Sequence, residues 1–169
     1  MHDDAIVFLR QFFTGGGAVY PLANVKKDDL RTIQSYAKQL FLGGNAVAAI
    51  RLYTWLLSFD HWNNEYWLSI GVCYQHLEHD EEALPYLVQA GMICPSDPRA
   101  AYYTGLSLER LRYYNAARRA YADAISWASN EHTSLSTVEQ IAKHATQAIA
   151  RLTMQDEGGQ QPRRNGENL

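Results

Sequence analysis

The chain lacks several features that mark secreted, membrane and disulfide-stabilised proteins. It has only two cysteines in 169 residues, Cys73 and Cys94, and both fall in expected helices, so we predict free thiols. No uncharged stretch approaches the roughly 20 apolar residues that span a bilayer, so we expect no stable membrane insertion. The first residues, Met1-His2-Asp3-Asp4, are acidic where a secretory signal is basic. We therefore expect a cytoplasmic protein.

Patterns for nucleic-acid binding and catalysis are scarce as well. The net charge is -3, with 15 Lys and Arg against 18 Asp and Glu, so the chain offers no basic stripe to neutralise phosphates. Gly15-Gly16-Gly17 lacks the Lys-Ser/Thr of a phosphate-binding loop and indicates a flexible joint. His76 and His79 begin no complete ligand set, so we interpret them as a pair at a helix end. We expect no enzyme, no cofactor, no metal and no direct nucleic-acid partner.

The strongest positive feature is a pattern that returns every 34 residues. Three columns share this period: Ala37, Gly71 and Gly105; Ala49, Ala83 and Ala117; Tyr53, Leu87 and Tyr121. The period is typical of tetratricopeptide repeats, which are helix-turn-helix units that stack into a solenoid. Small residues are expected where the two helices of one unit cross. The sequence predicts an all-α, right-handed solenoid of three repeats, residues 30–63, 64–97 and 98–131.

Local signals agree with these boundaries. Gly43-Gly44-Asn45 separates the first helix pair, and Asp97-Pro98 supplies an N-cap followed by a first-turn proline. Pro95 is expected to end the helix before it, because proline lacks the donor that the next turn needs. The third turn departs from the pattern, since Arg112-Tyr113 stands where Gly and Asn or Asp are expected.

The segments outside the repeats have distinct compositions. Residues 1–29 form an expected N-terminal helical arm and joint, with an apolar run of Ile6, Val7, Phe8, Leu9, Phe12 and Phe13. This run is either a cap on the first repeat or a subunit contact or partner site. The candidate contacts of a homodimer are Ile6, Phe8, Leu9, Phe12 and Phe13. Residues 132–154 form an expected capping helix, with one apolar face made by Leu135, Val138, Ile141, Ala145, Ile149 and Leu152. The polar segment 155–169 is expected to be disordered.

Helical periodicity places one set of side chains on the inner face of the solenoid. Repeat positions 2, 5, 6, 9, 12 and 13 of each first helix point into the concave groove. Apolar members would form pockets for the anchors of an extended peptide. Lys38, Arg99 and Arg110 would hold backbone carbonyls or an acidic side chain, although packing between repeats is the alternative role of any one position. The candidate peptide-binding residues are Gln34, Lys38, Phe41, Leu42, Leu68, Ser69, Val72, His76, Arg99, Tyr102, Tyr103, Leu106 and Arg110.

The junction between the first and second repeats carries a resemblance to a known family. Phe59-Asp60-His61, followed by Tyr66-Trp67-Leu68-x-x-Gly71, resembles the class II chaperones of bacterial type III secretion systems. The likeness covers roughly residues 20 to 152. It implies a cytosolic chaperone that holds secreted, hydrophobic, pore-forming translocator proteins before export. Family members often dimerise through N-terminal segments, and some also partner a transcription activator.

Two other readings of the groove stay open. A tetratricopeptide cochaperone that clamps a C-terminal carboxylate needs Lys and Asn early in the groove and another Lys and Arg in the third unit. The corresponding places here hold Gln34, Lys38, Ser69, Arg99 and Tyr103, which leaves two basic groups and an incomplete clamp. A general scaffold that binds another protein's peptide segment is the remaining alternative.

Overall fold

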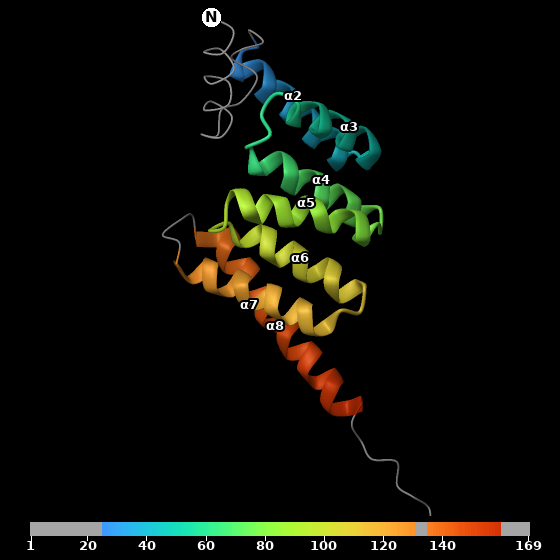
Figure 1. The fold of residues 1–169 in the computed structure, drawn as a ribbon, viewed down its shortest axis with the longest axis vertical. Coiled ribbons are helices and arrows are strands. Elements are labelled where there is room, and N and C mark those ends of the chain that lie inside the picture. Colours follow the sequence, from blue (N-terminus) through green and yellow to red (C-terminus); the bar gives the residue numbers. More distant parts are fainter. Residues whose placement is uncertain (1–24, 131–134, 160–169) are drawn as a thin grey trace, which may run out of the picture.

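The computed structural model describes residues 25–130 and 135–159, and these form seven α-helices with no strand among them. The helices stack in antiparallel pairs along the long axis of the molecule (Figure 1). This all-helical stack confirms the predicted fold class. The helices are α2 (Lys27–Leu42), α3 (Ala46–Leu57), α4 (Asn64–His76), α5 (Asp80–Ile93), α6 (Pro98–Arg110), α7 (Tyr114–Asn130) and α8 (Leu135–Gly159).

The repeating small residues lie where the two helices of each pair pack most closely. A Cβ atom on Gly71 of α4 would lie 2.5 Å from Cδ2 of Leu87 in α5. A Cβ on Gly105 of α6 would lie 2.7 Å from Cδ1 of Tyr121 in α7. Ala37 in α2 is the corresponding residue of the first pair and is fully buried. The 34-residue period is therefore a period of close contacts, and a larger side chain would force the paired helices apart.

The turns within the three pairs share one unusual backbone conformation. Gly44, Glu78 and Arg112 have φ angles of 83°, 62° and 66°, and the three residues are 34 positions apart in sequence. Glycine adopts this left-handed region without penalty, whereas a side chain makes it costly. The third turn has Arg112 at the position that glycine occupies in the first turn. Its backbone is therefore strained.

The ends of the helices follow the sequence signals. Asn45, Asn63 and Asp97 precede α3, α4 and α6, and their side chains accept hydrogen bonds from backbone N–H groups in the first turn. Pro98 opens α6. Pro95 follows α5 after a single intervening residue, as expected. Pro85 lies inside α5, which the sequence analysis did not anticipate.

Apolar side chains form three clusters that follow one another along the stack. One cluster joins α2, α3 and α4, a second joins α4, α5 and α6, and the third joins α6, α7 and α8. In α8 the buried face consists of Ile141, Ala145, Ala148 and Leu152. Each helix pair therefore covers the apolar face of the next, and α8 covers the last pair.

The chain ends differ from the expected boundaries or lie outside the described residues. Helix α8 begins at Leu135 and ends at Gly159, so it extends past the expected segment 132–154 and includes residues 155–159 of the segment expected to be disordered. The apolar run from Ile6 to Phe13 lies outside the described residues. Among residues 25–130 and 135–159, none of the helices combines the length and apolar character needed to cross a membrane.

Candidate peptide-binding cavity

The first helices of the three repeats line an open cavity of about 600 Å³. Eight of the candidate residues line it: Gln34, Lys38, Phe41, Leu68, Ser69, Val72, Arg99 and Tyr103. They come from α2, α4 and α6, which are the first helices of the three helix pairs. Because successive pairs stack in the same orientation, these three helices lie on the same side of the stack. The lining also includes Arg31, Ser35, Tyr53, Glu65 and Cys73. Sequence periodicity thus brings together residues from three separate helices.

The cavity is layered along the helix axes. Arg31, Glu65 and Arg99 occupy the same repeat position near the N-terminal ends of α2, α4 and α6. Lys38 and Val72 share a position seven residues later, which is about 10 Å further along the helices. The cavity therefore has a charged end and a more apolar part in which Lys38 lies beside apolar side chains.

Arg99 at the charged end is already paired. Its Nε donates to Oδ1 of Asp97 at 2.9 Å, its Nη2 donates to Oδ2 of Asp97 at 2.7 Å, and Nη1 and Nη2 both donate to the carboxylate of Glu65. Hydrogen bonding to Asp97, and then to Glu65, raises the pKa of the Arg99 guanidinium. Asn64 adds a further link to Asp97 at 3.2 Å. Arg99 therefore joins the second and third repeats, which differs from the expectation of a cation available to a ligand.

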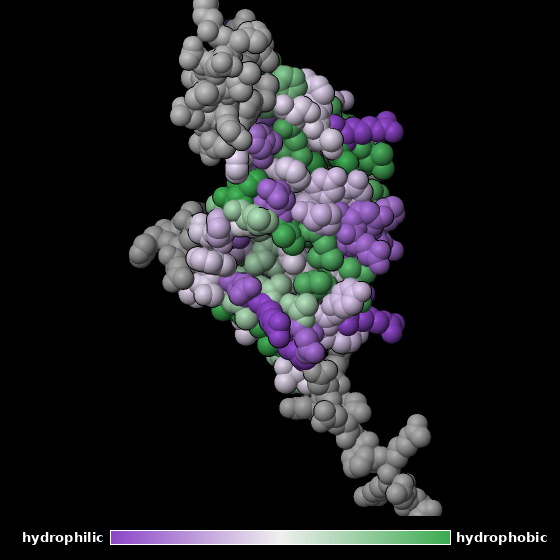
Figure 2. Space-filling model, viewed as in Figure 1, coloured by the Kyte–Doolittle hydropathy of each residue, from purple (hydrophilic) through white to green (hydrophobic). Residues whose placement is uncertain are grey.

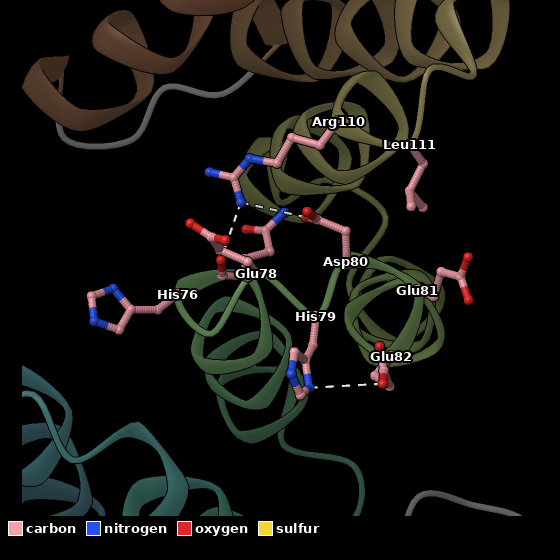
Figure 3. Close-up of a pocket in the computed structure, with 9 residues that line it drawn as sticks. His76, Glu78, His79, Asp80, Glu81, Glu82, Arg110 and Leu111 are labelled. Atoms are coloured by element: carbon pink, nitrogen blue, oxygen red, sulfur yellow. Dashed lines mark hydrogen bonds and ion pairs between the residues drawn. The ribbon is translucent and has the colours of Figure 1, made fainter.

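Arg110 is also paired, and it lies outside this cavity. With His76 it lines a separate polar hollow of about 700 Å³ at the turn between α4 and α5. Its Nη1 donates to the carbonyl oxygen of Gln75 at 3.1 Å and lies 3.4 Å from Oδ1 of Asp80 (Figure 3). His76 points away from that contact in the same view, and its ring meets the ring of Phe41 edge to face at 5.3 Å. His76 thus borders the apolar end of the cavity without lining it.

A buried polar chain fixes the spacing of α4, α5 and α6 behind the cavity. Gln75 Nε2 donates to Ser107 Oγ and to the carbonyl oxygen of Tyr103, both at 2.7 Å. Ser107 Oγ in turn donates to Oδ1 of Asp80 at 2.8 Å. Buried polar groups are costly unless they are satisfied, so this chain favours one relative placement of the helices. The sequence analysis did not find it, because its members carry no recognisable motif.

Three other candidate residues lie away from the cavity. Tyr102 packs against the core of the last repeat, with its ring centroid 5.8 Å from that of Tyr121 and 6.4 Å from that of His144. Burial raises the pKa of its phenol. Leu42 is 72% exposed at the end of α2, and Leu106 is half-buried outside the lining. Tyr102 differs from expectation because α8, which lies outside the repeat pattern, covers that side of α6.

Two lining residues were missed by the analysis of the first-helix face. Tyr53 comes from α3 and is only 4% exposed, yet its side chain reaches the cavity. Burial is the main cause of its raised pKa. Cys73 of α4 is buried, and burial raises the pKa of its thiol to about 12. Tyr53 belongs to the third column of the 34-residue pattern. The sequence analysis interpreted that column as core packing and not as part of the binding site.

The arrangement suits binding more than bond-making chemistry. Phe41, Leu68, Val72 and Tyr103 present apolar and aromatic surface, and a few polar side chains lie between them. Such concave sites bind extended segments through spaced apolar anchors. Figure 2 shows apolar surface between polar side chains over the middle of the stack on the face drawn. Within the described residues, no group of three or more His, Cys, Asp or Glu side chains is placed to hold a metal ion.

Comparison with known proteins gives a clear result for structure and none for sequence. No family model and no curated protein matches the chain. A T3SS complex from Aeromonas hydrophila matches with a TM-score of 0.80 and 19% identity, over 88% of this chain and 97% of that chain. The Yersinia enterocolitica type III secretion translocator chaperone SycD matches with a TM-score of 0.74 and 17% identity, over 80% and 98%.

A third similar structure contains a bound segment. PcrH, a protein from Pseudomonas aeruginosa, was solved in complex with the chaperone binding region of PopD. It matches with a TM-score of 0.73 and 20% identity, over 78% of this chain and 96% of that chain. These likenesses show that the chain shares the fold of these proteins across nearly their full length.

Proposed function

We propose that this protein is a cytosolic chaperone that binds a hydrophobic type III secretion translocator in its concave cavity and keeps it soluble until export. The observation that carries the proposal is the cavity, whose apolar lining extends across three repeats in the fold of PcrH and SycD. PcrH was solved with the chaperone binding region of PopD. The Phe59-Asp60-His61 junction supports the same family.

The dimensions and lining of the cavity fit an extended segment. Its volume of about 600 Å³ accommodates several side chains of a ligand. Phe41 and Val72 offer apolar contacts at one part, while Gln34 and Ser69 offer polar groups that can meet a peptide backbone. Binding of this kind needs no cofactor and no turnover, so one chaperone would hold one translocator segment.

The charge arrangement argues against a carboxylate-clamp cochaperone. Such a clamp needs several converging cationic groups, but Arg99 is occupied by Asp97 and Glu65. Arg110 is occupied by Gln75 and Asp80 and lies outside the cavity. A general scaffold for another protein's peptide remains the alternative function, and it would use the same cavity.

The N-terminal apolar run is the proposed subunit contact. Ile6, Phe8, Leu9, Phe12 and Phe13 lie outside the described residues, so support comes from their apolar character alone. SycD has also been solved as an alternative dimer.

Co-expression with a translocator from the same bacterium tests the proposal. We expect the translocator to remain in the supernatant and to co-purify with the chaperone in a stable complex, because its apolar segments are covered. A Phe41→Ala, Val72→Ala double variant should lose most of that complex while keeping its own helical fold. If the translocator is equally soluble and equally bound with the double variant, the cavity is not the binding site and the proposal fails.

A further inference from the structure

We infer that the bound segment presents an acidic side chain to Lys38, between apolar side chains that enter the part of the cavity near Phe41 and Val72. The inference rests on the proposed peptide-binding function and adds a specificity determinant to it. Its basis is the distribution of charge in and around the cavity.

Four charged side chains line the cavity, and three of them are already paired. Arg31 is 3.1 Å from Oδ1 of Asp28, and Arg99 is bonded to Glu65. Lys38 is exposed in the lining, and no carboxylate of the described part of the chain pairs with it. Lys38 is therefore the cation with which a bound carboxylate can pair without breaking an existing ion pair.

The charged end of the cavity would reject an acidic group. At this end Glu65 and Asp97 surround the guanidinium of Arg99. Asp28 pairs with Arg31, so three carboxylates face two guanidinium groups and the end carries an excess of negative charge. Lys38 lies about 10 Å further along the helices, beyond strong repulsion from that cluster. The opposite signs at the two places therefore fix the position of an acidic residue in the bound chain.

The surroundings of Lys38 favour an internal side chain over the C-terminus of a chain. On α2, Lys38 lies between Gln34 and Phe41, and all three line the cavity, so a bound chain continues in both directions past the lysine. A chain terminus needs several donors converging on both carboxylate oxygens, and Arg99 and Arg110 are occupied elsewhere. The ligand class is thus an extended segment with an Asp or Glu flanked by apolar residues.

Selection from a library of randomised dodecapeptides displayed on phage tests the inference, with each peptide fused to the coat protein through its C-terminus. The wild-type protein should enrich peptides in which Asp or Glu lies beside apolar residues. Lys38→Gln should enrich apolar peptides without the acidic residue. Lys143→Gln, which changes an exposed lysine of α8 away from the cavity, should select like the wild type.

A selected peptide and its acid-to-amide version give the quantitative test by calorimetric titration. The change from Asp to Asn should weaken binding to the wild type about fivefold at low salt, as for a partly exposed ion pair, and the effect should shrink in high salt. It should leave binding to Lys38→Gln unchanged. The inference is overturned if the wild type and Lys38→Gln enrich apolar peptides with the same preference for an acidic residue, or if neither shows such a preference. In both cases the proposed function stands. Failure of all three proteins to enrich any peptide overturns both.

Discussion

Gly71 and Leu87 pack so closely that a Cβ atom on the glycine would lie 2.5 Å from Cδ2 of the leucine, and the leucine is completely buried. The leucine cannot rotate away into solvent. The contact joins α4 to α5 within the central repeat, which supports the helices on both sides.

Gly71→Arg should disrupt the fold. A long charged side chain would enter a contact that leaves no space for a methyl group, so overpacking and a buried unpaired charge should together cost about 3 kcal/mol or more. Thermal melts followed by circular dichroism would measure the loss. Gly91→Ala is the matched control, because its Cβ would make an ordinary contact 3.6 Å from Ala100, and it should melt at or slightly above the wild-type temperature. An unchanged melt for Gly71→Arg would contradict the packing described here.

Arg112→Gly should stabilise the protein. The residue has a φ of 66°, a conformation that costs a side-chain-bearing residue about 1 kcal/mol relative to glycine, partly offset by the greater entropy of glycine in the unfolded chain. Urea denaturation should show a gain of about 0.5 kcal/mol. Gly44→Ala, at the equivalent turn with a φ of 83° and no atom within 4 Å of its Cβ, should lose about 1 kcal/mol. Equal stability of both variants and the wild type would show that these turns are unstrained.

Phe41→Ala and Tyr102→Ala should separate binding from folding. Phe41 lines the cavity, so its removal should lower cargo affinity by about 2 kcal/mol with a smaller effect on stability. Tyr102 packs against Tyr121 in the core of the last repeat, so its removal should mainly lower stability, by about 3 kcal/mol. Calorimetric titration and melts of both variants would measure the two effects. The reverse assignment, with Tyr102→Ala folded but unable to bind, would place the site elsewhere.

The two cysteines should differ in reactivity. Cys73 is 1% exposed and its pKa is raised to about 12 by burial, whereas Cys94 is half-buried. At about pH 8, Ellman's reagent should modify one thiol per native chain, and a Cys94→Ser variant should react only after denaturation. Two fast-reacting thiols in the native protein would contradict the burial of Cys73.

The same thiol should make stability depend on pH. Unfolded Cys73 ionises near the ordinary thiol pKa of 9.0, while the folded thiol keeps its proton to about pH 12. Because the folded state binds this proton more tightly, the stabilising contribution is complete below pH 9 and is lost as the pH rises toward 12. The free energy of unfolding should therefore decrease from about pH 8 to pH 10, and it should decrease less in Cys73→Ala.

Deletion of residues 1–20 tests the proposed subunit contact. If the apolar run around Phe8 and Phe12 joins two subunits, sedimentation should show a dimer for the full chain and a folded monomer for the truncated chain. The repeats should keep their helical content, because residues 25–130 and 135–159 already form continuous packed clusters. A full-length protein that is monomeric at tens of micromolar would favour a cap on the first repeat.

Much of the repeat architecture was predictable because it depends on short-range chemistry. The columns headed by Ala37 and Tyr53 require small residues opposite large ones, and Gly43-Gly44-Asn45 and Asp97-Pro98 mark helix ends directly in the sequence. The same period predicted that side chains from α2, α4 and α6 share one cavity.

The state of each cavity residue was harder to predict, because it depends on neighbours outside one repeat. Tyr102 and Tyr103 are adjacent on α6, but α8 covers the side of Tyr102 and leaves Tyr103 in the cavity. Arg99 looked available, although Glu65 stands 34 positions before it at the same repeat position and is its partner. Opposite charges at equivalent positions of consecutive repeats are a usable signal for such pairs.

The contacts between the second and third repeats have one further consequence. The polar contacts join residues 27 to 35 positions apart, from Asp80 with Ser107 to Gln75 with Arg110. Each contact therefore links a unit only to its immediate neighbour. A gene that deletes the second unit would set Arg31 of the first repeat beside Arg99, because Arg31 stands at the repeat position of Glu65. A change in the length of the groove by whole units therefore also requires new side-chain partners at the junction.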